Sequence, residues 1–165
     1  MRALLSATAF VALAIVSGAV CADESKVALS EVPKGGLEAV KAMFPAAEVT
    51  GAAKETDKDK TVFEVTLKEK GRTIDVTVGL DGKIQVVEKE IAAKDLPAAA
   101  RKAIDSKYPN ATFKIVEEVS AMKEGKLQLD FFEALLVTES KEKLEVQVTP
   151  DGKIKAEEKK TKDEE

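Results

Sequence analysis

The chain has 165 residues, of which 44% are hydrophobic and 34% charged, and its formal net charge is −4. This composition is typical of one globular domain or two small ones. The negative charge and the low aromatic content of 4%, with no Trp, argue against a nucleic-acid-binding protein. The absence of His and the single Cys exclude Ser-His-Asp and Cys-His catalysis, and also zinc sites built from His or several Cys.

Residues 1–22 differ in composition from the rest of the chain and predict a signal peptide. Arg2 precedes a long uncharged, apolar stretch, and small or modest residues then lead to Ala22 and the polar Asp23. Cleavage is expected between Ala22 and Asp23, which would place the protein in the periplasm or outside a bacterial cell, without a stable membrane span.

Two alternatives to a cleaved leader stay open from the residues alone. The apolar stretch is only slightly shorter than the roughly 20 residues of a membrane anchor. Cys21 could carry a lipid, although Gly18 and Val20 stand where a lipoprotein signal usually has Leu and a small residue. After cleavage the chain would have no cysteine, which excludes a thiol-redox catalyst.

Two similar segments follow the leader. Pro33 and Pro45 bracket the first, and Pro97 and Pro109 bracket the second, 64 residues further on. Between each pair of prolines the apolar residues recur with helical spacing, and proline favours both the start and the end of a helix. The pattern predicts one helix in each segment, with Gly35 and Gly36 weakening the first.

After each predicted helix the hydrophobic period changes to two, which indicates strands with one buried face and one solvated face. The alternation is clearest at Phe63–Leu67, Ile74–Val78 and Leu144–Val148. First strands are expected at Val49–Lys54 and Phe113–Val119, and last strands at Ile84–Glu88 and Ile154–Glu158. The dipeptides Asp81-Gly82 and Asp151-Gly152 predict the hairpin turns that join the closing strands.

These patterns predict an α+β fold of two tandem α-β-β-β-β repeats, each an antiparallel sheet covered by one helix. The expected boundaries are an N-terminal linker at 23–31, a first repeat at 32–91, a second at 92–158 and a charged, disordered tail at 159–165. We expect the repeats to pack as one body, and the residues leave open whether their sheets are continuous. Around Phe131-Phe132 the alternation is interrupted, either by a β-bulge or by a different strand boundary.

The second segment carries the clearest family resemblance. Leu96 to Ile104 (LPAAARKAI), Lys107 to Ala111 (KYPNA) and the closing Asp-Gly-Lys-Ile hairpin resemble the PepSY-like family, which is also described as β-lactamase-inhibitor-like. The first segment is a weaker match, through Val32-Pro33, Phe44-Pro45 and the same hairpin. The resemblance implies an exported bacterial protein without known catalysis, and some relatives are suspected to inhibit or regulate secreted enzymes, notably peptidases.

The polar face of the strands is the main candidate for a binding surface. Its expected partner-facing members are Glu64, Thr66, Asp75, Thr77, Glu145 and Gln147. These residues could serve only to keep this face of the sheet solvated. If they bind a partner, charge complementarity favours a partner with a basic patch or a basic peptide.

Other candidate residues are better explained by structure than by chemistry. Asp57 and Asp59 lack the oxygens, the Gly and the Glu of a calcium loop, so a solvated turn is expected. Neighbouring strand residues such as Glu117 and Glu118 point to opposite faces and cannot form a catalytic pair. Tyr108 matches Phe44 of the first segment and is expected to pack, with its hydroxyl near the helix end. No catalytic residue, metal site or cofactor is predicted.

The sequence therefore predicts an exported, non-enzymatic binding module, such as an inhibitor or regulator of a secreted or envelope enzyme. Its partner would be a protein or peptide of the envelope or the extracellular space. A protein that binds a small ligand or cation is the first alternative. A hydrolase that uses only carboxylates is the second, and it would need two acids flanking a cleft.

Overall fold

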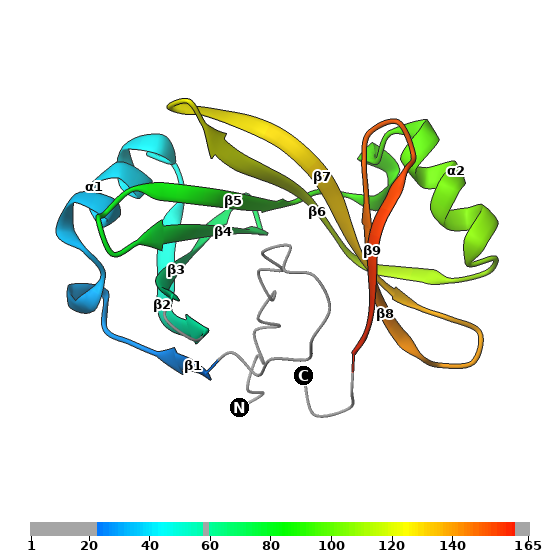
Figure 1. Ribbon diagram of the computed structural model, residues 1–165, viewed down its shortest axis with the longest axis horizontal. Helices are drawn as coiled ribbons and strands as arrows, with labels where there is room; N and C mark the ends of the chain where they lie inside the picture. Colours follow the sequence, from blue (N-terminus) through cyan, green and yellow to red (C-terminus); the bar gives the residue numbers. More distant parts are fainter. Residues whose placement is uncertain (1–22, 58–59, 161–165) are drawn as a thin grey trace.

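The computed structural model describes residues 23–57 and 60–160, which form one antiparallel sheet with two helices packed on it (Figure 1). The helices are α1 (Lys34–Met43) and α2 (Ala98–Lys107), and each is preceded by a short 3-10 turn. The strands are β1 (Asp23–Lys26), β2 (Glu48–Asp57), β3 (Lys60–Glu69), β4 (Arg72–Gly79), β5 (Ile84–Glu90), β6 (Thr112–Lys123), β7 (Lys126–Val137), β8 (Lys143–Val148) and β9 (Ile154–Lys160).

Both helices lie where the prolines predict them. Pro33 and Pro97 stand directly before α1 and α2, and each helix ends at the aromatic residue that precedes the next proline. The backbone N–H of Phe44 donates to the carbonyl of Val40, and that of Tyr108 donates to the carbonyl of Ile104. The same proline and aromatic punctuation therefore sets the length of both helices.

The strands form a nine-stranded sheet in which β1 to β9 are neighbours in chain order. The sheet is continuous because β5 pairs antiparallel with β6, from Val86 opposite Ala121 to Glu90 opposite Glu117. The chain passes through α2 between these two strands, so the segments before and after Glu90 share one sheet. Figure 1 shows this sheet bent into an arch, with α1 and α2 on its outer side.

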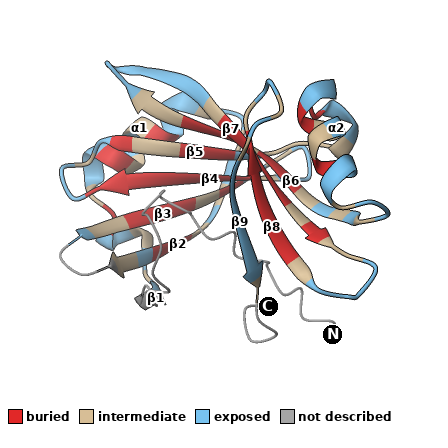
Figure 2. Cartoon of the chain, turned by 45° about the vertical axis from the view of Figure 1, so that its right-hand side comes forward, coloured by how far each residue is buried: buried red, intermediate tan, exposed pale blue. Residues whose placement is uncertain are grey.

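Two apolar cores lie between the helices and the outer face of the sheet (Figure 2). Val40 of α1 and Ile104 of α2 are completely buried in them. The first core contains Phe63, Val65, Leu67, Ile74, Val76 and Val78, and the second contains Val116, Phe132, Ala134, Leu136, Val146 and Val148.

One row of cross-strand partners shows that both helices cover the same face. Ile74, Lys89, Glu118, Phe132 and Val148 stand opposite one another on successive strands from β4 to β8. The row begins in the core under α1 and ends in the core under α2. Cross-strand partners share a face of the sheet, so both helices of the described residues, 23–57 and 60–160, lie on this one face.

The prediction of a linker at residues 23–31 is wrong. Asp23–Lys26 form β1, which pairs with β2, and the backbone N–H of Val27 donates to the carbonyl of Ala52 at 3.0 Å. Val27 and Leu29 also pack against the first core. The strand is held by its backbone hydrogen bonds, and its polar sequence shows no alternation that would reveal it.

The predicted tail is also too long. β9 runs to Lys160, whose side chain pairs with Glu145 across the sheet, so residues 159 and 160 belong to a strand. Residues 161–165 lie outside the described part of the chain. The ion pair explains why a strand of mostly charged residues continues this far.

The interruption at Phe131-Phe132 is a β-bulge, as one of the two alternatives proposed. Val119 faces Phe131 and Ser120 faces Leu129, which leaves Asp130 as the extra residue on β7. Phe132 therefore enters the second core, and Phe131 lies on the inner face under the Lys155 ammonium, 4.5 Å from its ring centre. Both rings are buried, so neither is an exposed contact residue.

The predicted leader at 1–22, with Cys21 and the cleavage site after Ala22, lies outside the described residues. Within residues 23–57 and 60–160, no helix is long and apolar enough to cross a membrane.

Candidate binding face

The six predicted partner-facing residues all lie on the inner face of the sheet, opposite the helices. Glu64 on β3 faces Thr77 on β4, and Thr66 faces Asp75. Glu145 and Gln147 occupy the same face of β8, at the other end of the sheet. The alternation of each strand places them there, because their neighbours in sequence enter the cores.

Three further carboxyl groups join these two ends, and the sequence reasoning did not assign them to the face. Glu88 on β5 stands opposite Asp75, and Glu117 on β6 stands opposite Glu133 on β7. We call the set the acidic row; it consists of Glu64, Asp75, Glu88, Glu117, Glu133 and Glu145.

Different causes hid the three residues. Glu88 is the last residue of the strand predicted at Ile84–Glu88, where the alternation is short, whereas β5 continues to Glu90. Glu117 does point away from Glu118, as predicted, but towards Glu133 rather than towards solvent. Glu133 looked like an error in the pattern because the bulge at Asp130 reverses the phase before it.

The prediction that this face is solvated is wrong. All six members of the acidic row are buried in the full chain, as are Thr77 and Gln147, and only Thr66 is half-exposed. The sheet is curved (Figure 1). This curvature is one physical cause of the burial, because side chains on a concave face converge. A row of buried carboxyl groups is costly unless the groups are neutral or bind cations.

Burial and mutual repulsion change the protonation of the row. Burial, reinforced by the charges of Glu117, Glu133, Glu64 and Asp75, raises the pKa of Glu88 to about 10. Burial together with Asp75, Glu145 and Glu90 raises the pKa of Glu117 to about 8. The pKa of Glu133 is raised as well, chiefly by burial and by Glu145. The centre of the row therefore holds protons at neutral pH.

Two polar atoms on the inner face have no hydrogen-bond partner among the described residues. They are Oε2 of Glu88 and Oγ1 of Thr77, whose side chains are 2% and 4% exposed. By contrast, Glu133 accepts a hydrogen bond at 3.0 Å from the Gln147 amide. Buried polar atoms are normally satisfied, so unpaired ones indicate a place for a ligand group.

An ammonium group already occupies the end of the row. Lys160 of β9 places its Nζ 2.9 Å from Glu145 Oε2 and 3.4 Å from Glu158 Oε2, with its side chain only 10% exposed. Burial opposes its charge, but the two carboxylates prevail and the pKa of Lys160 is raised. The face can therefore hold a buried cation when carboxylates surround it.

The described residues contain no group of three or more His, Cys, Asp and Glu with the geometry of a metal site. Asp59 and the side chain of Asp57, considered for a calcium loop, lie outside the described part of the chain.

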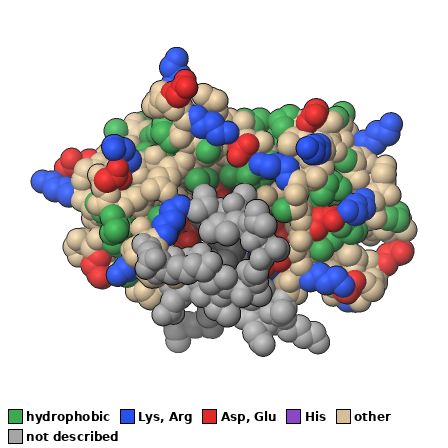
Figure 3. Space-filling model, in the orientation of Figure 1, with side chains coloured by type: hydrophobic (Ala, Val, Ile, Leu, Met, Phe, Trp, Pro, Cys, Tyr) green, Lys and Arg blue, Asp and Glu red, His purple; other side chains and the backbone are tan. Residues whose placement is uncertain are grey.

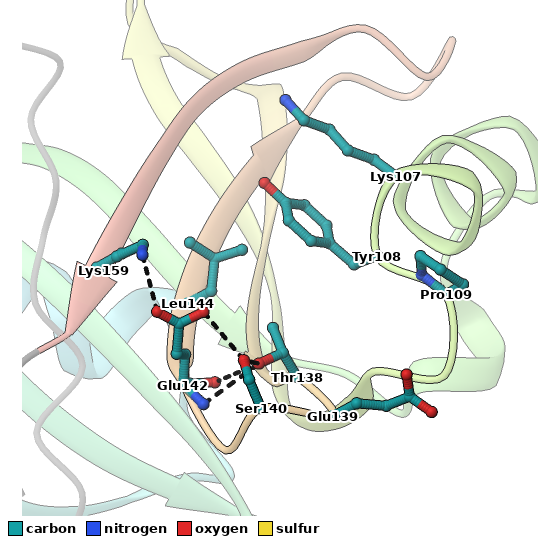
Figure 4. A pocket seen from close by; sticks show the side chains of 9 residues that line it. All are labelled: Lys107, Tyr108, Pro109, Thr138, Glu139, Ser140, Glu142, Leu144 and Lys159. Atoms are coloured by element: carbon teal, nitrogen blue, oxygen red, sulfur yellow. Dashed lines mark hydrogen bonds and ion pairs between the residues drawn. The ribbon is translucent and has the colours of Figure 1, made fainter.

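A second candidate is a pocket of about 430 Å³ between the end of α2 and the β7–β8 turn (Figure 4). Its lining is Lys107, Tyr108, Pro109, Thr138, Glu139, Ser140, Glu142, Leu144 and Lys159. Lys159 pairs with Glu142 at 2.8 Å and Lys107 pairs with Glu157 at 2.5 Å. Because these charges are already compensated within the protein, the pocket is the weaker candidate.

Tyr108 in this pocket serves to fix α2, as the sequence predicts. Its ring packs against the second core and its hydroxyl donates to Glu157 of β9. Burial and the Glu157 carboxylate raise the pKa of Tyr108 to about 12, so the hydroxyl remains a donor at any physiological pH.

The rest of the visible surface has no comparable concentration of one charge. Figure 3 shows basic and acidic side chains intermingled on the face of the molecule in view. Several form exposed ion pairs, such as Arg101 with Asp105 at 2.8 Å. The acidic row is therefore set apart by its single sign of charge as well as by its burial.

The fold belongs to a known architecture. No protein-family model matches the chain, and no curated protein matches its sequence. Solved structures do: a DUF2874 family protein from Bacteroides uniformis is 18% identical, with a TM-score of 0.62 over 77% of this chain and 88% of that one. A BLIP-like protein from Bacteroides fragilis is 19% identical, with a TM-score of 0.57 over 77% of this chain and 85% of that one.

A third structure is similar to the same extent. It comes from Bacteroides eggerthii, has been suggested to be periplasmic, and is 18% identical, with a TM-score of 0.62 over 78% of this chain and 88% of that one. The chain therefore has a BLIP-like fold.

Proposed function

We propose that the protein is an exported binding module without enzymatic activity, whose acidic row grips a basic segment of a partner protein. The observation that carries the proposal is the row itself, which is six carboxyl groups on six neighbouring strands, on the face opposite α1 and α2. Such an array attracts cationic side chains and repels acidic competitors, which gives specificity as well as attraction. The partner would be a secreted or envelope enzyme, such as a peptidase, that the module inhibits or regulates.

The compartment and the family origin are parts of the same proposal. The signal-like residues 1–22 and the similarity to a protein suggested to be periplasmic support a bacterial periplasmic or secreted location. The 3-10 turn, helix and four strands that occur on either side of Ile91 support an origin from two PepSY-like repeats. The BLIP-like fold supports a role in binding another protein.

The inventory of side chains supports a role without catalysis. The chain has no His, and the carboxyl groups of the acidic row lie on neighbouring strands of one sheet. A glycosidase would need one ionised and one protonated acid at a defined separation around the substrate. Cation binding is the alternative that the row itself raises, and calorimetry separates it from peptide binding.

The test is isothermal titration calorimetry of the purified protein with an N-acetylated hexa-arginine peptide, a hexa-glutamate peptide and CaCl2. We expect saturable binding of the arginine peptide alone, weakening as salt is added. The triple variant Glu64→Gln, Asp75→Asn, Glu145→Gln should lower the affinity at least tenfold.

The matched control neutralises the same number of carboxyl groups away from the inner face, in the variant Glu69→Gln, Glu118→Gln, Glu124→Gln. It should bind like the unmodified protein. Equal loss in both triple variants would show that net charge alone drives binding, and saturable heat with CaCl2 alone would favour the cation-binding alternative.

A further inference from the structure

The centre of the acidic row combines features that the ends do not. At the centre, Glu88 carries a buried Oε2 without a hydrogen-bond partner among the described residues, and Glu117 and Glu133 face each other directly across β6 and β7. Two carboxylates directly opposite on neighbouring strands repel each other unless at least one is protonated or a cation lies between them. At the Glu145 end, a member of the row is paired with an internal cation, the ammonium group of Lys160.

We propose that the centre of the acidic row, formed by Glu88 and the Glu117–Glu133 pair, is a subsite for one guanidinium or ammonium group, and that the cation enters by displacing protons. The inference rests on the proposed function and adds to it the ligand group and its coupling to pH. N–H donors of the incoming cation replace carboxyl O–H groups, and each proton released passes to the solvent. Lys160 beside Glu145 and Glu158 is the internal example of the bound state.

Several charged groups face this subsite, and together they set how many protons it exchanges. Those facing Glu88 are Glu64 on β3, Asp75 on β4, Glu117 on β6 and Glu133 on β7. Glu90 on β5 adds negative charge beside Glu117, Glu145 on β8 adds it beside Glu117 and Glu133, and Lys160 on β9 offsets part of it at Glu133. Because negative groups dominate, an added cation favours ionisation of every carboxyl near it.

The size of the coupling follows from proton linkage. A cation that binds the ionised subsite must release the protons held there before binding. Its affinity then rises with pH by up to about tenfold per pH unit for each proton released. A partner would be held at neutral or alkaline pH and let go on acidification.

Calorimetry in two buffers tests the inference. The N-acetylated hexa-arginine peptide is titrated into the protein at pH 7 in phosphate and in Tris, whose ionisation enthalpies differ. The peptide has no group that titrates near this pH, so any proton counted comes from the protein. We expect release of about one proton or more per peptide, and tighter binding at pH 8 than at pH 6.

Single variants locate the protons. Glu88→Gln and Glu117→Gln should each release fewer protons than the unmodified protein, while Glu118→Gln, on β6 but facing the helices, should release the same number. Binding without proton release, or release unchanged in both inner-face variants, would overturn this inference and leave the proposed function standing. Absence of arginine-peptide binding from pH 6 to pH 9 would overturn both.

Discussion

At the scale of single residues, two adjacent glycines in α1 have opposite roles. A Cβ on Gly36 would lie 2.3 Å from Cγ1 of Val78 and 3.2 Å from the carbonyl oxygen of Gly82, so the helix can approach the β4–β5 hairpin only because this side chain is absent. A Cβ on Gly35 would meet nothing within 4 Å. Both glycines weaken the helix, but only Gly36 is required by the packing of α1 against the sheet.

We expect Gly36→Ala to destabilise the protein by about 1–3 kcal/mol, because the methyl group overpacks the contact with Val78. Gly35→Ala should instead stabilise it by up to about 1 kcal/mol through helix propensity. Urea unfolding followed by circular dichroism measures both free energies. Equal effects of the two substitutions would mean that α1 does not pack as closely as described.

At the scale of secondary-structure elements, the Glu117–Glu133 pair couples β6 and β7 to pH. The folded-state pKa of Glu117, about 8, lies above its ordinary value of 4.5. Between these values the folded protein binds more protons than the unfolded chain, so the free energy of unfolding falls as pH rises. The contribution is complete below pH 4.5 and is lost as pH passes through about 8.

Glu117→Gln should therefore match the unmodified protein at pH 5 and exceed it at pH 9, by about 1 kcal/mol or more. Glu118→Gln faces the helices and should leave the pH profile parallel to that of the unmodified protein. Denaturant unfolding at pH 5, 7 and 9 gives the three profiles. A Glu117→Gln profile that also runs parallel would show that Glu117 ionises normally in the folded state.

The elements that sequence predicted well are those with a local physical signal. Proline punctuation determined α1 and α2, and alternation with Asp-Gly turns indicated β3, β4, β8 and the closing hairpins. Two features depended on tertiary contacts instead. β1 is polar and held by backbone pairing with β2, and the position of Glu133 is set by the bulge at Asp130. For the same reason only half of the acidic row was predicted. The other half, Glu88, Glu117 and Glu133, joins the row through strand register, which a local pattern does not show.

At the scale of the whole molecule, pairing of β5 with β6 joins the strands of the two separate cores into one sheet. If the strands of one core unfolded, the β5–β6 pairing would break and the neighbouring strand of the other core would become an exposed edge. Tyr108 packs against the second core and is the single Tyr of a chain without Trp, so its fluorescence reports that half specifically.

We expect Val40→Ala, in the first core, to lower the unfolding midpoint measured at Tyr108 as much as that measured by circular dichroism. Loss of the buried methyl groups should cost about 2 kcal/mol in both signals. Lys41→Ala, exposed on the same helix, is the control and should change neither. A Tyr108 midpoint that stays in place would mean that the two halves unfold independently.

The nine-stranded sheet is open, so β1 and β9 are edge strands that could pair with another molecule. An uncovered strand edge can template pairing with another chain and start aggregation. Here one border is a strand of four residues, and the other, β9, carries Lys155, Glu157, Glu158, Lys159 and Lys160. A second molecule approaching β9 would have to strip water from this run of charge, and this cost opposes strand pairing at that edge.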